Sequence, residues 1–250
     1  MAIGDFFEKR LQDLARLAQN RDIVVFTDFL NLEELNIVKN TSYQWKGIRT
    51  EYFGGLDFSE RQIAALIPDA LSYAWEYPIV CLHIELNNRK FHGTLTHRNY
   101  LGAVLNLGIE RSKIGDIYVG EHDAYLFCHE QMEEFICREL FKVGNEEVSL
   151  AKVYDFSQIP SPKFEMIKDT ISSLRLDAII ARGFKLSRAS IIKYIEGGKV
   201  YVNGKLITSN GHPIKEEDLI SVRGLGRLRF LKTVATTKKN RYWVEIQKYI

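Results

Sequence analysis

Apolar residues recur at helical spacing near the start of the chain, and this pattern predicts an amphipathic helix over residues 5–20. The apolar run 23–26, which contains two β-branched valines, predicts a short strand. Two capping boxes, each with Glu or Gln three positions after its first residue, predict helices that begin after Asn31 and after Ser59. Residues 1–77 are therefore expected to form an N-terminal α/β domain.

The middle of the chain alternates between strand-like and helix-like patterns in the order strand, helix, strand, strand, helix, strand. The expected bounds are 79–86, 97–107, 116–119, 124–128, 131–141 and 147–154. Ferredoxin-like domains have this order, and RNA-recognition-motif (RRM) domains share it. We therefore expect a central RRM-like domain over residues 78–155. Its third strand lacks the basic and aromatic signature that stacks bases, which favours a structural or docking role.

Residues 156–169 contain two prolines and little periodicity, so they are expected to be a linker to a C-terminal domain over residues 170–250. In that domain, apolar stripes predict two helices, the first ended by Gly183 and the second N-capped by Ser187. An Asn-Gly pair shortly afterwards predicts a tight β-hairpin. The expected fold class is α+β, with three small domains.

Charge is distributed unevenly along the chain, although the net charge is only +2. Residues 175–250 contain 16 Lys and Arg against six Asp and Glu, a net charge of +10, whereas residues 1–174 carry a net charge of −8. This asymmetry is typical of a polyanion-binding module joined to a segment that does not bind polyanions. A solvated basic surface without a partner is the alternative.

Composition narrows the setting in which the protein works. Apolar residues make up 46% of the chain, which is inconsistent with a disordered protein. The cysteines, Cys81, Cys128 and Cys137, are spaced too widely for a zinc knuckle and are expected to be buried thiols in a reducing compartment. The apolar runs are shorter than a bilayer span, and a signal peptide is not expected. We therefore expect a cytoplasmic protein without metal, other cofactor or membrane partner.

Folded RNA is the polyanion that suits this basic module best. A rigid pair of basic helices can bind the phosphates and the wide, shallow minor groove of folded RNA without flipping bases. The predicted RNA-binding residues are basic side chains of the C-terminal domain, together with one serine and one asparagine. They are Arg175, Arg182, Lys185, Ser187, Arg188, Lys193, Lys199, Asn203, Lys205, Arg223, Arg227, Arg229, Lys238, Lys239 and Arg241.

Several of the polar and aromatic candidates have a structural alternative. Ser187 is expected to cap its helix rather than to contact RNA. Asp177 is expected to be a structural partner of a nearby base or backbone donor, because surrounding positive charge favours its ionised form and makes it unsuitable as a proton donor. His97 and Arg98 form a candidate second contact with RNA or protein, with a local backbone contact as the alternative. Trp243 could stack on a base, but core packing is favoured.

Residues 175–223 resemble the RNA-binding domain named after ribosomal protein S4 of the small subunit. The matching elements, in order, are Arg175-Leu176-Asp177, Ser187-Arg188, Gly198, Val200-Tyr201-Val202-Asn203-Gly204 and Asp218-Leu219-Ile220-Ser221-Val222. The wider chain resembles the bacterial YlmH family over nearly its full length. The supporting segments are Tyr52-Phe53-Gly54-Gly55, Glu60-Arg61, His97-Arg98-Asn99-Tyr100-Leu101-Gly102, Lys113-Ile114-Gly115-Asp116 and Ser221-Val222-Arg223-Gly224-Leu225-Gly226-Arg227.

The resemblance implies a ribosome-associated RNA-binding protein whose partners are ribosomal RNA, of the large subunit in particular, and, as a further candidate, tRNA. Some members of the family are linked to rescue of stalled large subunits that carry peptidyl-tRNA, and gene neighbourhood gave the family a cell-division label. We therefore expect a factor in ribosome quality control or rescue that acts without catalysis, as a monomer when free.

Two other functions stay open. One is a protein-interaction factor for cell division or assembly, in which the acidic first two thirds of the chain is the working part. The other is an RNA-modifying enzyme with an unrecognised active site, although pseudouridine synthases and one class of methyltransferases, which share the S4-like module, carry it N-terminal to their catalytic domain. Within the RNA-binding hypothesis, Arg188→Glu combined with Lys193→Glu is expected to abolish binding with little change in thermal stability.

Overall fold

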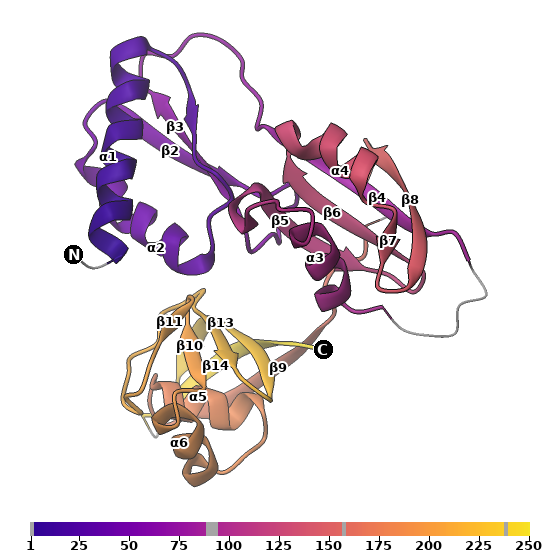
Figure 1. The fold of residues 1–250 in the computed structure, drawn as a ribbon. Helices are drawn as coiled ribbons and strands as arrows, with labels where there is room; N and C mark the ends of the chain where they lie inside the picture. The colour runs from indigo at the N-terminus through magenta and orange to yellow at the C-terminus, as the bar shows by residue number, and fades with distance from the viewer. Residues whose placement is uncertain (1–2, 89–94, 157–158, 238–239) are drawn as a thin grey trace. The chain divides into compact units, whose positions relative to one another are not determined.

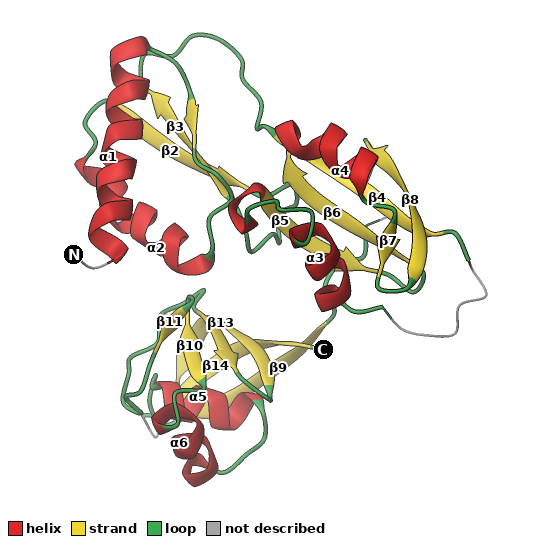
Figure 2. Cartoon of the chain, in the orientation of Figure 1, coloured by secondary structure: helices red, strands yellow, loops and turns green. Residues whose placement is uncertain are grey.

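The chain divides into two compact units, Met1–Ser161 and Pro162–Ile250, and each is described by itself. The computed structural model describes residues 3–88, 95–156, 159–237 and 240–250 (Figure 1). Helices account for 29% and strands for 36% of the residues, which confirms the expected α+β class (Figure 2). The finer domain boundaries expected from the sequence stay predictions. Among the described residues, no helix combines the length and the apolar character that crossing a bilayer requires.

The first unit begins with two helices packed on a small sheet. Its elements here are α1 (Ile3–Arg21), β1 (Val25–Phe26), α2 (Leu32–Thr41), η1 (Ser42–Gln44), β2 (Ile48–Phe53) and β3 (Ile63–Pro68). The sheet order is β1-β3-β2, and both pairings are antiparallel. The capping box predicted for α2 is confirmed, because the Asn31 side chain accepts from the Glu34 N–H at 3.0 Å and the Glu34 carboxylate accepts from the Asn31 N–H at 2.7 Å.

The helix predicted after Ser59 is wrong, because the structure has strand β3 in its place. Ser59 stabilises a turn instead of a helix: its hydroxyl oxygen accepts from the Leu56 N–H at 3.1 Å. Each residue of β3 is buried, since the strand lies in the middle of its sheet beneath α1. A strand buried on both faces has a continuous apolar run, and periodicity alone does not distinguish such a run from a buried helix.

The remainder of the first unit has the expected strand–helix order with one extra short strand. Its elements are β4 (Ile79–Leu86), α3 (His97–Leu105), η2 (Arg111–Lys113), β5 (Ile114–Val119), β6 (Asp123–His129), η3 (Glu130–Met132), α4 (Glu133–Glu139), β7 (Lys142–Val143) and β8 (Glu146–Val153). The antiparallel sheet order β5-β6-β4-β8-β7 places the first and third main strands at the centre, as in ferredoxin-like folds. Residues of α3 and α4 share a core with inward-facing residues of this sheet.

The second face of this sheet packs against the N-terminal elements of the same unit. Cys81 and Phe127 lie on that face and share a buried cluster with Phe29, Ile63 and Ile159. The two rings nearest the centre of an RRM sheet are normally free to stack bases. Here the central part of the corresponding face is buried inside the first unit, so its side chains pack in a core and do not stack on bases.

Arg61 joins these two parts of the first unit through backbone carbonyls. Its guanidinium donates to the carbonyl oxygens of Phe29 at 2.8 Å, Arg111 at 3.1 Å and Ile114 at 2.9 Å. The half-buried Asp116 accepts from the Glu60 N–H at 2.6 Å, and loss of solvation raises its pKa. The Glu60-Arg61 and Lys113–Asp116 segments that carried the family resemblance therefore serve interior packing.

We expect Arg61→Lys to lower the free energy of unfolding of the first unit by about 2 kcal/mol, because lysine lacks the planar fork that satisfies three carbonyls. Chemical denaturation followed by circular dichroism measures this change. The matched control is Arg49→Lys, because Arg49 is an exposed residue of β2 whose side chain pairs with Glu51. Equal stability of the two variants would contradict a structural role for Arg61.

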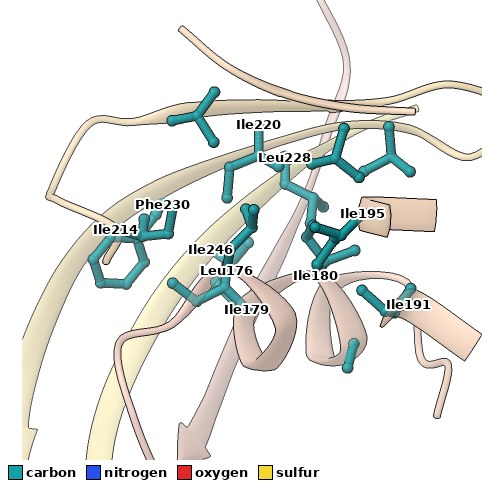
Figure 3. Packing of buried hydrophobic residues seen from close by; sticks show 14 of the residues in the cluster. Leu176, Ile179, Ile180, Ile191, Ile195, Ile214, Ile220, Leu228, Phe230 and Ile246 are labelled. Carbon is teal, nitrogen blue, oxygen red and sulfur yellow. The ribbon is translucent and has the colours of Figure 1, made fainter. Parts of the chain in front are cut away.

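The second unit is a six-stranded antiparallel sheet with two short helices on one face. Its elements are β9 (Phe164–Ile171), α5 (Leu176–Gly183), α6 (Arg188–Glu196), β10 (Val200–Val202), β11 (Lys205–Leu206), β12 (Leu219–Val222), β13 (Gly226–Thr236) and β14 (Tyr242–Tyr249). The sheet order is β11-β10-β12-β13-β14-β9. Leu176, Ile179 and Ile180 of α5 pack with Leu228 and Phe230 in the core of this unit (Figure 3).

The last six residues of the segment expected to be a linker differ from that expectation. Residues 164–169 form the larger part of β9, which pairs with β14 along its whole length, from Phe164 opposite Tyr249 to Ile171 opposite Tyr242. The partner strand lies more than seventy positions later in the chain, so a local pattern could not reveal the pairing. As a result, β9 lies beside α5 at the edge of the sheet.

Candidate nucleic-acid interface

The helix pair forms as the sequence predicts, with the caps in the expected places. The Ser187 hydroxyl oxygen accepts from the Ser190 N–H at 3.1 Å, which confirms that Ser187 N-caps α6. Gly183 ends α5 where the chain passes close to Leu228, and a Cβ at this position would lie 2.4 Å from a Leu228 methyl carbon. Lys185 follows in the left-handed region, with φ of 56°. The turn between the helices is therefore tightly packed, and its exposed side chains project from fixed backbone positions.

Asp177 links the two helices through two arginines. Its side chain is only 3% exposed, and it forms ion pairs with Arg175 (Nε to Oδ1, 3.3 Å) and with Arg188 (Nε to Oδ2, 3.1 Å). Both guanidiniums remain about half exposed. This confirms the structural role predicted for Asp177, and it fixes two cations at the surface without the entropy cost of free side chains. It also changes the expectation for Arg188→Glu, which now includes a loss of stability.

A basic groove lies between β9 and the helix pair. It encloses about 650 Å³, and the cations along it are Arg182, Lys185, Arg188 and Arg241. Its apolar lining comes from β9, α5 and the turn between the helices, and consists of Ile167, Ile171, Ala178, Ala181 and Leu186. The structure thus brings together four of the predicted RNA-binding residues from two separate parts of the chain, the helix pair and the segment just before β14. We call this feature the basic groove.

The cations at the basic groove have weak or incomplete partners. Arg182 pairs with Asp169 at 3.1 Å, and Lys185 pairs with Glu165 at 3.4 Å, in both cases with exposed groups. Hydrogen bonds from Lys248 lower the pKa of Glu165 and keep it ionised. Exposed pairs of this kind contribute little to stability, so a phosphate can replace the carboxylate at small cost. Arg241 donates to the Thr170 carbonyl at 2.8 Å, while its buried Nε has no hydrogen-bond partner in the described part of the chain.

The other predicted contacts lie elsewhere on the second unit. Lys193 and Lys205 are exposed, and neither has an ion pair within the residues that the structure describes. Lys199 lies 5.5 Å from the centre of the Tyr194 ring. Arg227 is exposed, and Arg229 pairs with Glu217 at 3.7 Å.

Three more of the predicted residues need separate comment. The Asn203 side chain is used inside the hairpin, where it donates to Asp218 at 2.8 Å and accepts from the Leu219 N–H at 2.9 Å. Asn203 therefore supports the hairpin and is a poor candidate for direct contact with RNA. Lys238 and Lys239 lie outside the described residues.

The candidate second contact belongs to the first unit. His97 and Arg98 lie exposed in the first turn of α3, so their side chains are accessible to a partner. Among the described residues, no group of three or more His, Cys, Asp or Glu side chains is arranged to hold a metal ion. Trp243, expected in the core, is instead 41% exposed on β14.

Comparison with known proteins gives consistent matches for both units. Residues 73–156 match the family described as "Putative RNA-binding domain in YlmH", and residues 174–220 match the S4 domain. The chain is 30% identical over 236 residues to a Bacillus subtilis (strain 168) protein called "Ribosome-associated protein quality control protein P2". This match covers 93% of this chain and 90% of the relative. It also resembles a solved structure described as "Cell division protein ylmH from Streptococcus pneumoniae", with a TM-score of 0.52, 26% identity, and coverage of 64% of this chain and 97% of that one.

Proposed function

The chain belongs to the YlmH family, and from this membership we propose that it is a ribosome-associated RNA-binding factor that acts by binding rather than by catalysis. Its proposed partner is ribosomal RNA, of the large subunit in particular, with tRNA as a second candidate. The proposed process is ribosome-associated protein quality control, the activity in the name of the Bacillus subtilis relative, and the proposed location is the cytoplasm.

The observation that carries this proposal is the basic groove with Arg182, Lys185, Arg188 and Arg241 along it. Each of these side chains is a phosphate ligand by type, and arginine in particular matches phosphate oxygens through two parallel N–H donors. The unit Pro162–Ile250 contains 18 Lys and Arg against eight Asp and Glu, so its net charge of +10 attracts RNA from a distance.

The proposed binding mode follows from how the cations are held. Asp177 orients Arg188 from beneath, so this guanidinium is in place before RNA arrives. Lys185 and Arg182 exchange exposed carboxylates for phosphates when the backbone of the RNA enters the groove. Rigid cations at fixed spacing recognise the shape of a folded backbone, and they do not require individual bases to be flipped out.

Ribosome co-sedimentation with mapped crosslinks tests this proposal. We expect the full chain to sediment with large subunits and to crosslink to RNA through residues of α5 and α6. The variant Lys185→Gln/Lys193→Gln removes two exposed charges and is expected to weaken association roughly 10–50-fold at physiological salt. The matched control is Lys9→Gln/Lys46→Gln, which removes two exposed charges from the first unit.

The outcome of the same experiment separates the alternative functions. Failure to sediment with either subunit would contradict the proposal and favour a protein-interaction role, such as the cell division named for the Streptococcus pneumoniae structure. An equal loss of association in the double variant and in its control would also contradict it, because binding would then depend on total charge rather than on the basic side chains of the helix pair.

A further inference from the structure

The six-stranded sheet of the second unit has a face that no helix of that unit covers. Helices α5 and α6 lie together on the opposite face (Figure 1). Residues directly opposite one another in antiparallel strands share a face, and side chains alternate along each strand. Tyr201, Ser221 and Arg227 are opposed in this way across β10, β12 and β13, and they alternate with the core residues Val200 and Ile220.

The same face continues across the other three strands. Arg229 lies opposite Gln247, which lies opposite Met166, and two residues further along β14 Glu245 lies opposite Lys168. Trp243 follows at the next outward position of β14. We call this surface the open face and define it by Tyr201, Arg227, Arg229, Met166, Lys168 and Trp243.

Aromatic rings and cations alternate on the open face. The Arg223 guanidinium lies 4.9 Å from the centre of the Tyr201 ring, so the two groups are already arranged for cation–π contact. Trp243 and Met166 are 41% and 47% exposed, although large apolar groups on a strand usually pack into a core. Because cations interrupt the apolar surface, it lacks the continuous apolar centre that a stable protein interface requires.

The balance of charge on the open face favours an anion. The acid on β14, Glu245, is held by Lys168 at 2.8 Å and by Lys232 at 3.8 Å, and these contacts lower its pKa. The side chains of Lys168 and Lys232 are each 58% exposed, so both remain accessible. Arg227 adds an exposed cation close to Tyr201 across β12.

We propose that the open face binds single-stranded RNA, with bases stacked on Tyr201 and Trp243 and the backbone neutralised by Arg227 and Lys168. Basic surfaces with aromatic platforms bind unpaired strands in this way, because every base has a ring face that can stack. The S4 match covers residues 174–220, so the three strands β9, β13 and β14 lie wholly outside it. The inference extends the proposed RNA-binding function with a second class of RNA, unpaired strands, at a separate surface.

The central sheet of the first unit is excluded as a surface for stacking bases. In the central sheet, the RRM-type platform around Cys81 and Phe127 is buried against Phe29 and Ile63, and therefore does not offer its rings to a base. The open face of the second unit has what this central platform lacks: the exposed Trp243 ring and the half-buried Tyr201 ring lie among exposed cations.

Binding of a fluorescein-labelled oligouridine of about ten nucleotides to the full chain tests the proposal, with fluorescence anisotropy as the readout. We expect Trp243→Ala to weaken binding at least fivefold and Trp243→Phe to retain most of it, because stacking on one ring contributes roughly 1–3 kcal/mol. Arg227→Gln is expected to weaken binding, because it removes one exposed cation from the open face. Trp243→Ala is not expected to change co-sedimentation with ribosomal subunits.

The outcomes distinguish this inference from the function proposed above. Unchanged oligouridine affinity in both Trp243→Ala and Arg227→Gln would overturn the open-face site, even if the chain sediments with subunits. Loss of oligouridine binding in Lys185→Gln/Lys193→Gln alone would assign the strand to the helix pair and also overturn the open-face site. If Trp243→Ala left oligouridine binding intact but changed the sedimentation velocity of the protein relative to the wild type, the open face would be a protein–protein interface instead. Oligouridine binding that depends on Trp243, without association with subunits, would support the inference and contradict only the ribosomal proposal.

Discussion

The affinity of the full chain for structured ribosomal RNA is expected to fall by roughly three orders of magnitude between about 50 and about 200 mM monovalent salt. Each phosphate that a lysine or arginine neutralises releases counterions, and release becomes less favourable as the salt concentration rises. With roughly five to eight phosphate contacts, the slope of log affinity against log salt is about −4 to −7. Filter binding or fluorescence anisotropy over a salt series measures the slope directly.

Variants assign this slope to the helix pair α5–α6 and the turn between its helices. Lys185→Gln/Lys193→Gln is expected to make the slope less steep by about 2, because each lost phosphate contact contributes about one. Lys9→Gln/Lys46→Gln in the acidic first unit is expected to leave the slope unchanged. A wild-type slope near zero would exclude an electrostatic clamp altogether.

Arg188→Glu is expected to lower the free energy of unfolding of the second unit by about 3 kcal/mol, and its melting temperature by roughly 10–20 °C. The substitution removes one partner of the buried Asp177 carboxylate and places a second negative charge beside it. Arg175 remains as a partner at 3.3 Å, which keeps the loss at the lower end of the range for broken buried pairs. Differential scanning calorimetry of the full chain, with the two units resolved, measures the change.

Two further variants isolate the cause. Lys193→Glu reverses an exposed charge on the same helix, where the described residues provide no ion-pair partner, and is expected to change stability by less than about 0.5 kcal/mol. Adding Asp177→Asn to Arg188→Glu removes the like-charge repulsion and is expected to restore about 1 kcal/mol or more. No recovery in this double variant would show that the loss has another origin.

The stability of Arg188→Glu also affects how RNA-binding variants are interpreted. From the sequence, the pair Arg188→Glu and Lys193→Glu was expected to report on RNA contact alone. The ion pair with Asp177 means that loss of binding in that variant can follow from loss of folding. Lys185 and Lys193 are better probes, because their side chains are exposed and no buried group depends on them.

The sequence by itself determined the features whose causes are local. Caps act over three or four residues, so Asn31 and Ser187 were predicted in the roles that the structure confirms. Helical periodicity acts over two or three turns, and it located α5 and α6 closely. The concentration of basic residues in the C-terminal third and the family resemblance also require nothing beyond the order of residues.

The tertiary structure alone decided which of those residues meet. Arg241 reaches the basic groove because β14 pairs with β9. Its hydrogen bond to the Thr170 carbonyl joins residues that are 71 positions apart in the sequence. Burial determined that Arg188 is tied to Asp177, that β3 is a strand, and that Trp243 is exposed beside cations. The physical reason is common to all of these: strand pairing and burial depend on partners far away in the chain, whereas caps and helical periodicity depend only on neighbours.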